Sequence, residues 1–584
     1  MAYGALYNMD RFVMISKHRV VFGAACLALC LSAFAAGGSP VADAAMNGDH
    51  AALRALLEQK APVNVAQADG ATAIQWAAYR NDLEMADLLI GAGANVKTGN
   101  REGVTPLWLA AENGNAAMIE KLLAAGADPN ERRPTGETPL MMAARNGSVA
   151  ALEVLLKHKA DVNLKENLRG TTALMWAVEQ SHADAVRVLI ARGADLNAAT
   201  AADTRNSRLN IAPTVAQRAA QDVNFGRRPR QVAGGKGKAA ADPLPDDFAD
   251  FYRLPAVKDG GGLTPLVYSA REGCVECARI LVEAGVNVNQ RTNYGWTPLL
   301  TATQNRHYRL AAYLMDHGAD PNLANKGGWT PLYLGTDNRN IEAGDYPVRK
   351  PDMDHLEFIK LLLAKGANVN TRICGAESTA KECKGDTTET RTNFTMQWLF
   401  EDGATPFLRA AQSGDVVLMK LLLEHGADPK IPTAHNDTAL AVASGIGWVE
   451  GITFEWSPQE ALEAIKMCLD LGIDVNTVDD QGRTALHGAA HKGRTDVIQV
   501  LVDRGANLEA HDFGSRDTFA GAMKGMTWIP LDWARGLVRV GVQSALPHPE
   551  AEKLLVKLMT DRGLKIPPPP TSSICLTKGV NGCQ

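Results

Sequence analysis

The sequence predicts an all-α repeat array, a solenoid of about 11 to 12 units with loop insertions. Two observations carry this prediction. A Thr-Pro-Leu phrase, or a close variant of it, recurs at spacings near 33 residues, as at Thr72 and Thr105. A Gly-Ala-Asp/Asn phrase, such as the one that begins at Gly126, closes most copies. Self-similarity at a period of this size indicates a stack in which each unit contacts only its neighbours.

Each part of the repeated unit has a physical reason. Thr is a good N-cap for a first helix, and the Pro behind it sits in the first turn, where no N–H is required. A small pair such as Ala110-Ala111 lets neighbouring helices approach closely. An apolar run such as 119–123 buries a second helix, and the Gly that follows ends that helix in the left-handed conformation.

The copies divide into an N-terminal block, 36–201, and a C-terminal block, 262–566. Residues 202–261 separate the blocks and are rich in Ala, Arg, Pro and Gly. A degenerate last copy of the repeat begins near Ile529. The clear copies begin at Ser39, Thr72, Thr105, Thr138, Thr172, Thr264, Thr297, Thr330, Thr405, Thr438 and Thr484.

Longer gaps in the C-terminal block predict three insertions, near 339–354, 373–401 and 446–458. Loops on a rigid scaffold often carry binding. Residues 567–584 form a Pro-rich tail with two Cys, whose first part we expect to be extended.

These phrases, in phase over nearly all of residues 36–566, resemble those of the ankyrin-repeat family. The resemblance implies a curved stack of helix pairs, with short β-hairpin fingers and first helices lining a concave face. It also implies a role in binding other proteins. The family has no fixed ligand, so the fold alone does not name the partner.

Residues 1–35 have the layout of a secretory signal peptide. A basic cluster around Lys17 and Arg19 precedes an apolar run from Val20 to Phe34, and small residues offer a cleavage site. The run is shorter than the ~20 residues that cross a bilayer. No other segment is long and apolar enough to span one. We therefore expect an exported array of bacterial type, periplasmic or secreted, with no transmembrane span after cleavage.

Charge and motifs argue against several function classes. The chain has 60 Lys and Arg against 65 Asp and Glu, a net charge of -5, which does not favour nucleic acid as a partner. No phosphate-binding loop, nucleophile elbow or zinc-protease helix occurs. His487 and His491 have a metal-ligand spacing, but His487 occupies a position where these repeats carry a structural His. We expect a monomer that is not an enzyme and needs no cofactor or metal.

The cysteines suggest an oxidising compartment. Each of two pairs closes a short loop and is a disulfide candidate: Cys374 with Cys383, and Cys575 with Cys583. We expect Cys468 to be a buried free thiol.

Cys274 and Cys277 form a Cys-x-x-Cys motif at the start of a second helix. Such a pair can be redox-active, because the helix N-terminus can lower a thiol pKa. The alternative, which we favour, is a structural disulfide or an apolar role for Cys277.

The repeat alignment predicts which side chains face the concave side. The first series lies two residues after the Leu-type position, and a second series lies three residues further on. Hot spots favour Trp, Tyr and Arg, so both series are candidates for partner binding. The alternative is packing between adjacent first helices, which we favour for Trp108. In the N-terminal part the candidates are Trp76, Leu109, Met142, Trp176 and Tyr268, with Tyr79, Glu112, Arg145, Glu179 and Arg271. The first series continues with Thr301, Leu334, Arg409, Val442 and Gly488.

The insertion near 446–458 is a second binding candidate, because Trp448, Phe454 and Trp456 concentrate aromatic surface there. It either folds down over the helices, which we favour, or presents a recognition loop.

The leading hypothesis is an exported protein-binding scaffold with no catalysis of its own. The alternatives are a thiol–disulfide protein that uses Cys274 and Cys277, and a secreted effector that binds a host protein.

Overall fold

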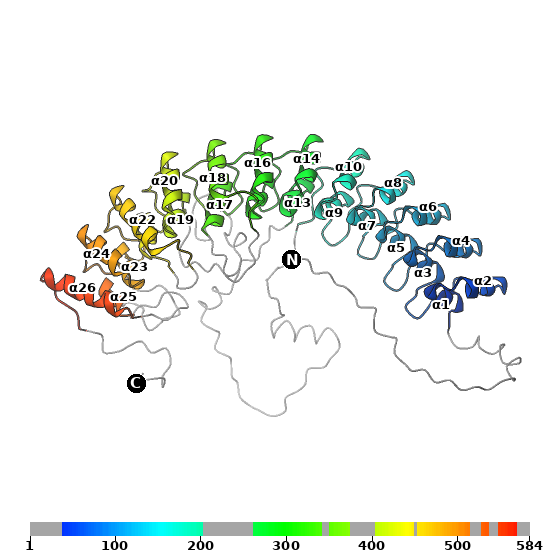
Figure 1. Ribbon diagram of the computed structural model, residues 1–584, viewed down its shortest axis with the longest axis horizontal. Coiled ribbons are helices and arrows are strands. Elements are labelled where there is room, and N and C mark those ends of the chain that lie inside the picture. The colour runs from blue at the N-terminus through cyan, green and yellow to red at the C-terminus, as the bar shows by residue number, and fades with distance from the viewer. Residues whose placement is uncertain are drawn as a thin grey trace, which may run out of the picture.

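A computed structural model describes residues 38–202, 261–340, 350–373, 403–448, 453–513, 527–536 and 547–568. These residues form twelve helix pairs, here units one to twelve, stacked side by side in a curved array (Figure 1). The signal-like residues 1–35 and the predicted disulfides Cys374–Cys383 and Cys575–Cys583 lie outside the described residues. No helix in the described ranges is long and apolar enough to cross a membrane.

The first helix of each unit lies on the inner side of the curve and packs against the first helix of the next unit (Figure 1). These helices are α1 (Pro40–Asn47), α3 (Ala73–Arg80), α5 (Pro106–Glu112), α7 (Pro139–Asn146), α9 (Ala173–Glu179), α13 (Pro265–Glu272), α15 (Pro298–Gln304), α17 (Pro331–Arg339), α19 (Pro406–Gln412), α21 (Ala439–Ser444), α23 (Ala485–His491) and α25 (Pro530–Ala534).

The second helices form the outer edge of the curve (Figure 1). They are α2 (His50–Glu58), α4 (Leu83–Gly91), α6 (Ala116–Ala124), α8 (Val149–Lys157), α10 (Ala183–Ala191), α14 (Val275–Glu283), α16 (Tyr308–Asp316), α18 (His355–Ala364), α20 (Val416–Glu424), α22 (Pro458–Asp470), α24 (Thr495–Asp503) and α26 (Pro549–Asp561).

The helix boundaries confirm the role predicted for the repeated phrase. Thr105 Oγ1 accepts a hydrogen bond from the Trp108 N–H at 3.1 Å, and most first helices are capped in the same way. In unit eleven, the His487 imidazole accepts from the Thr484 N–H at 3.0 Å, and burial lowers the pKa of His487 to about 3. The structural role predicted for His487 is confirmed. Gly126, in the closing phrase, has φ +97, which is left-handed as expected.

The fingers between units differ from the expected β-hairpins, because the described residues contain no β-strand. Each finger is a turn closed by one backbone hydrogen bond across its base, such as Asn100 N–H to Val104 O at 3.0 Å. Consecutive fingers are also joined, as where the Arg101 N–H donates to Asp69 O at 3.1 Å. A single bond at the base and a single bond to the next finger are too few for strand pairing.

At most junctions, the closing phrase also joins a unit to the next through an Asn side chain. Asn163 donates from Nδ2 to Gly193 O at 3.1 Å and accepts from the Asp195 N–H at 2.8 Å. Asn64, Asn130, Asn289, Asn322, Asn370 and Asn476 make the same pair of bonds to the next unit.

The long segment 203–260 does not interrupt the stack. Helix α9 packs against α13, and α10 packs against α14, as in any other neighbouring pair. The Thr200 N–H donates to Leu263 O at 3.0 Å, which is the bond that closes an ordinary finger. The N-terminal and C-terminal blocks are therefore divided in sequence but continuous in structure, with the segment inserted at a finger.

Two more long segments enter at the same place in the unit. The Ile373 N–H donates to Ala404 O at 3.1 Å, and the Asp512 N–H donates to Trp528 O at 3.0 Å. Segments 374–402 and 514–526 therefore also begin and end at the base of a finger. These fingers follow units five, eight and eleven.

A second apolar cluster lies apart from the main core, along the first helices of units seven to ten. We call it the inner cluster, and Trp296 packs against it. Its buried members are Leu300, Trp329, Tyr333, Leu334, Ile373, Ala404, Leu408 and Val442.

Two buried ion pairs join units eight and nine. Arg409 Nε lies 2.7 Å from Asp337 Oδ1, and its other nitrogens donate to Ser413 Oγ at 2.8 Å and to Asn340 O at 2.7 Å. Arg339 Nε in turn lies 2.7 Å from Asp415 Oδ2. The Arg409 side chain is only 2% exposed, so its charge depends on these partners.

We expect Arg409→Ala to destabilise the protein strongly, because it leaves Asp337 buried without its cation. Breaking a buried pair in this way costs about 3–5 kcal/mol. Urea unfolding gives the size of the loss, and amide exchange in α17 and α19 locates it. Lys420→Ala is the matched control, since the Lys420–Glu463 pair is exposed and such pairs contribute about 1 kcal/mol or less. Equal effects of the two substitutions would contradict the prediction.

Candidate functional site

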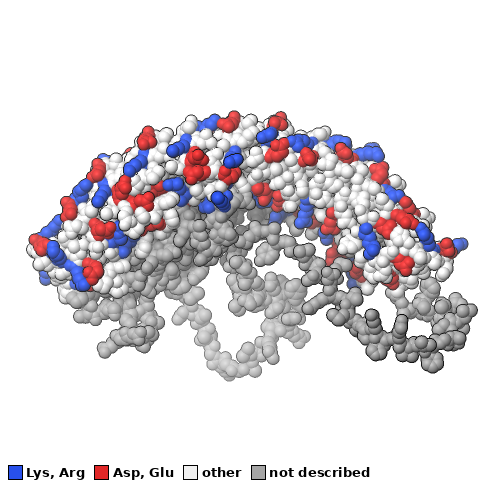
Figure 2. All heavy atoms as spheres, in the orientation of Figure 1, with Lys and Arg blue, Asp and Glu red and all other residues white. Residues whose placement is uncertain are grey.

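The concave side of units two to six carries most of the predicted partner-binding residues. The outer edge carries mixed charge instead, and Figure 2 shows Lys and Arg interspersed there with Asp and Glu. Part of that charge is paired between neighbouring second helices, as in Lys121–Asp87 at 2.6 Å and Lys365–Asp316 at 2.7 Å. The outer edge is therefore a solvated face, and the search for a site turns to the first helices and fingers.

Trp76 and Tyr79 present aromatic surface at the start of the array. The Trp76 indole is half-buried and donates from Nε1 to Gln67 Oε1 at 2.7 Å. Gln67 is held by Asp43, which accepts from its Nε2 at 2.7 Å. Tyr79 is 54% exposed, and its ring meets the Trp76 ring edge-on at 5.9 Å. Both rings are thus oriented before any partner arrives.

A second group spans the junction between units five and six. Trp176 donates from Nε1 to Thr171 Oγ1 at 2.7 Å, and the Arg145 guanidinium lies 5.8 Å from its ring. Across the junction, Arg271 pairs with Glu179 at 2.9 Å and lies over the Tyr268 ring at 4.6 Å. The structure therefore brings together five of the predicted residues.

Some of the predicted partner-binding residues are buried. Met142 is 5% exposed and Tyr268 is 3% exposed, and burial raises the pKa of the Tyr268 phenol. Leu109 is half-buried, whereas Glu112 is exposed, with a pKa raised by partial desolvation against the opposing Arg133 and Arg145. Met142 and Tyr268 therefore follow the packing alternative.

In the C-terminal half, burial removes even more of the predicted partner-binding residues from the surface. Leu334 and Val442, at 1% and 2% exposure, belong to the inner cluster. Arg409 is held in the ion pair with Asp337, and Thr301 is 8% exposed. These residues cannot contact a partner without repacking. Apolar neighbours on successive first helices bury one another here, which a single repeat position does not reveal.

Trp108 was expected to pack, and it does so. It is 8% exposed and lies beneath the Arg133 guanidinium at 4.9 Å.

The ends of the insertion near 446–458 lie on other units, while residues 449–452 are outside the described residues. Trp456 donates from Nε1 to Asn340 Oδ1 at 2.9 Å and lies under Arg339 at 4.7 Å, with Phe454 edge-on at 5.5 Å. Trp448 lies 5.3 Å from the Lys492 ammonium. At these three aromatics the arrangement agrees with the folded-down alternative, although Trp456 remains 40% exposed.

Sequence reasoning missed two features of the concave side. Leu168 is 71% exposed at a finger tip, where the equivalent residues of other fingers are mostly polar. The second feature is a cleft of about 310 Å³ between units six and seven. In the sequence, Trp296 could have indicated this cleft, because it directly precedes the capping Thr, as Trp329 does in the next finger. The cleft is lined by Gly261, Leu263, Val267, Arg271, Thr292, Tyr294, Trp296, Thr301, Gln304 and Asn305.

The motif Cys274-x-x-Cys277 is a disulfide in the structure. Cys274 is the N-cap of α14, and its sulfur accepts from the Cys277 N–H at 3.1 Å. Cys277 is fully buried and Cys274 is 9% exposed. Cys468 is a buried free thiol, as predicted, and burial raises its pKa to about 12.

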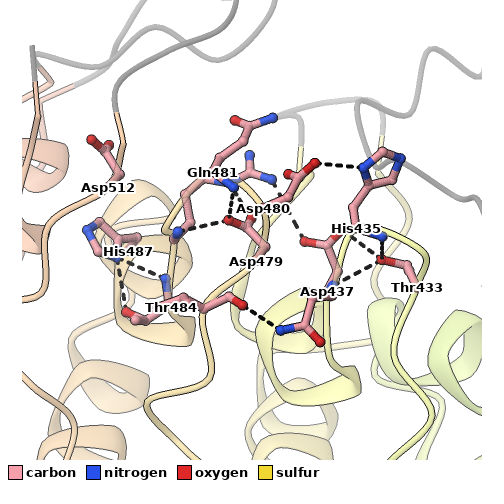
Figure 3. Close-up of polar contacts among 12 residues, drawn as sticks. Thr433, His435, Asp437, Asp479, Asp480, Gln481, Thr484, His487 and Asp512 are labelled. Atoms are coloured by element: carbon pink, nitrogen blue, oxygen red, sulfur yellow. Dashed lines mark hydrogen bonds and ion pairs between the residues drawn. The ribbon is translucent and has the colours of Figure 1, made fainter. Parts of the chain in front are cut away.

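A buried polar cluster joins the fingers that follow units nine and ten (Figure 3). Asp437 accepts from Thr433 Oγ1 at 3.0 Å, while Arg483 pairs with Asp479 at 2.5 Å and reaches Asp437 only at 3.8 Å. Two carboxylates share one cation, and burial raises the pKa of Asp437 to about 7. Within the described ranges, no group of His, Cys, Asp or Glu is arranged to hold a metal ion.

His435 and Asp480 flank this cluster, with Nδ1 and Oδ2 2.8 Å apart (Figure 3). The Asp480 N–H also donates to His435 O at 2.9 Å, so the two fingers are joined through both backbone and side chain. The cluster's function is to hold the fingers together.

We expect the raised pKa of Asp437 to make stability depend on pH. Its folded pKa of about 7 exceeds the usual 3.8, so its contribution is complete below about pH 4 and is lost as pH rises through 7. Asp437→Asn should flatten this dependence, which urea unfolding at pH 5 and pH 8 measures. Asp428→Asn, at an exposed position nearby, is the control. An unchanged slope in Asp437→Asn would refute the assignment.

Models of known protein families match the same repeats. Residues 41–133, 109–200 and 253–325 match a family model described as ankyrin repeats in three copies. Residues 459–502 match one described as ankyrin repeats in many copies, and residues 402–434 match the single ankyrin repeat. Together these matches cover more than half of the chain.

Similar proteins share only part of their length with this chain. Palmitoyltransferase AKR1 of Lachancea kluyveri is 31% identical over 114 residues, which is 20% of this chain and 14% of that protein. The probable E3 ubiquitin-protein ligase XBOS33 of Oryza sativa is 31% identical over 176 residues, 27% of this chain and 31% of that protein. The putative ankyrin repeat protein YahD of Escherichia coli is 39% identical over 54 residues, which is 9% of this chain and 27% of that protein.

This chain spans less than a third of each of these relatives, and the names of the first two describe different activities. The capped helix pairs, the joined fingers and the family matches lead to one conclusion: the chain belongs to the ankyrin-repeat family.

Proposed function

We propose that this protein is an exported protein-binding scaffold that acts through its concave surface and catalyses no reaction of its own. The observation that carries the proposal is the series of pre-oriented aromatic residues on the first helices of units two to five. Trp76, Tyr79 and Trp176 lie on first helices of one continuous stack, and the finger between units four and five adds the exposed side chain of Leu168.

The chemistry of these residues suits a protein partner. Both indole N–H groups are already satisfied within the chain, by Gln67 and Thr171, so the rings can lose water on binding without leaving a donor unpaired. Their orientation is fixed beforehand, which reduces the entropy lost on association. Tyr79 and Leu168 offer exposed apolar area, and the Arg145 guanidinium lies over the Trp176 ring.

Export is supported by two independent features. The basic cluster and apolar run within residues 1–35 have the layout of a signal peptide. The Cys274–Cys277 disulfide is suited to an oxidising compartment. We therefore place the protein in the periplasm or outside the cell. A secreted effector that binds a host protein would use the same surface and differ only in where the partner is found.

We expect Trp76→Ala/Trp176→Ala to weaken partner binding, because loss of a central aromatic contact typically costs tenfold or more, about 1–2 kcal/mol each. The measurement is affinity capture from envelope extract with the mature chain, followed by titration of the captured protein. Circular dichroism shows whether the variant stays helical.

Val417→Ala is the matched control, since Val417 is 51% exposed on the outer helix α20. It should leave binding unchanged. A partner that binds the control and the double variant equally would show that the aromatic series is not the contact surface.

A further inference from the structure

The cleft between units six and seven is lined by aliphatic, aromatic and polar side chains. Leu263 and Val267 supply aliphatic surface, and the finger of unit seven adds Tyr294 and Trp296. Its volume of about 310 Å³ is at the lower end of the range for small-ligand sites, so it suits one large side chain more than an extended ligand.

One polar atom at this cleft is unpaired. Gln304 Oε1 is buried and accepts no hydrogen bond from the described residues. The neighbouring polar groups are already in use: Asn305 Nδ2 donates to Thr301 O at 2.9 Å, and Thr301 Oγ1 donates to Thr297 O at 2.8 Å. A buried acceptor without a donor is costly, so a ligand that brings a donor to Gln304 gains binding energy.

The charges at the mouth of the cleft exclude an anionic ligand. Arg271 is the cation that lines it, and its guanidinium is paired with Glu179 at 2.9 Å and with Glu272 at 2.7 Å. A carboxylate or phosphate would have to displace these partners. An uncharged side chain avoids that cost, and the aromatic walls favour a flat ring.

We propose that this cleft receives one tryptophan or tyrosine side chain presented by the partner protein, with its ring N–H or O–H donating to Gln304. This inference rests on the proposed function as a protein-binding scaffold. It names the chemistry of one contact, and it places that contact one unit beyond the aromatic series, on the same concave side.

The test uses N-acetyltryptophanamide as the probe and N-acetylphenylalaninamide, which lacks the ring donor, as its control. Ligand-observed NMR with the whole mature chain measures both affinities. We expect the tryptophan amide to bind about tenfold more tightly, because only its ring carries a donor for Gln304, whereas the amide donors are common to both probes. Gln304→Met keeps the length of the side chain but removes the acceptor, so the preference should disappear. Gln499→Met, on α24 outside the cleft, should keep it.

Three results would overturn the inference. The first is equal binding of the two amides, and the second is a preference that survives in Gln304→Met. The third is binding only after Phe251→Ala/Tyr252→Ala, which would assign the cleft to these two aromatic residues of the chain's own segment 202–261 instead of a partner.

The outcomes also separate this inference from the proposed function. If a partner is captured through Trp76 and Trp176 but neither amide binds, the inference fails and the scaffold function stands. If the tryptophan amide binds with the expected preference but no partner is captured, the cleft stands and the scaffold function fails.

Discussion

The whole array depends on the bonds that join each unit to the next. An Asn side chain such as Asn163 bridges two units by donating to one backbone carbonyl and accepting from one N–H. Each unit has too little apolar surface to fold alone, so stability comes from these joints and from helix packing between neighbours. Consecutive fingers are joined in a similar way, by hydrogen bonds between their backbones. Because most joints link adjacent units, the stack can extend through twelve of them by repeating the same contacts.

Local joints also explain how the array carries long inserted segments. Residues 203–260, 374–402 and 514–526 all enter at the base of a finger, where the closing hydrogen bond still forms. An insertion at that point leaves the helices and the core of both neighbouring units in place. Lengthening a loop costs little once its ends are held together. Fingers are therefore one of the positions where this fold accepts additions; the insertions near 339–354 and 446–458 lie instead between the two helices of a unit.

The two halves of the concave side have different physical characters. In units two to five, aromatic rings are half-buried, hydrogen-bonded and still partly open to a partner. In units eight to ten, the equivalent residues Leu334, Arg409 and Val442 belong to the inner cluster or the Arg409–Asp337 pair, and these side chains stabilise the array. The cleft beside Trp296 lies between the two regions. Binding is thus best supported from unit two to unit seven, with the remaining units serving as the scaffold.

The sequence was enough to predict the repeat, the helix pairs, the capping Thr, the structural His487 and the buried Cys468, because each follows from a local pattern of propensity and periodicity. It did not determine whether a concave position is open. Trp176 and Tyr268 occupy the same repeat position, yet only Tyr268 is covered, by Arg271 from its own helix, which Glu179 on the preceding unit holds in place. It also did not determine that the stack is continuous across 203–260, or that Leu263, Tyr294 and Gln304 enclose a cleft. Exposure and enclosure depend on which side chains neighbouring units bring together, and only the tertiary structure decided that.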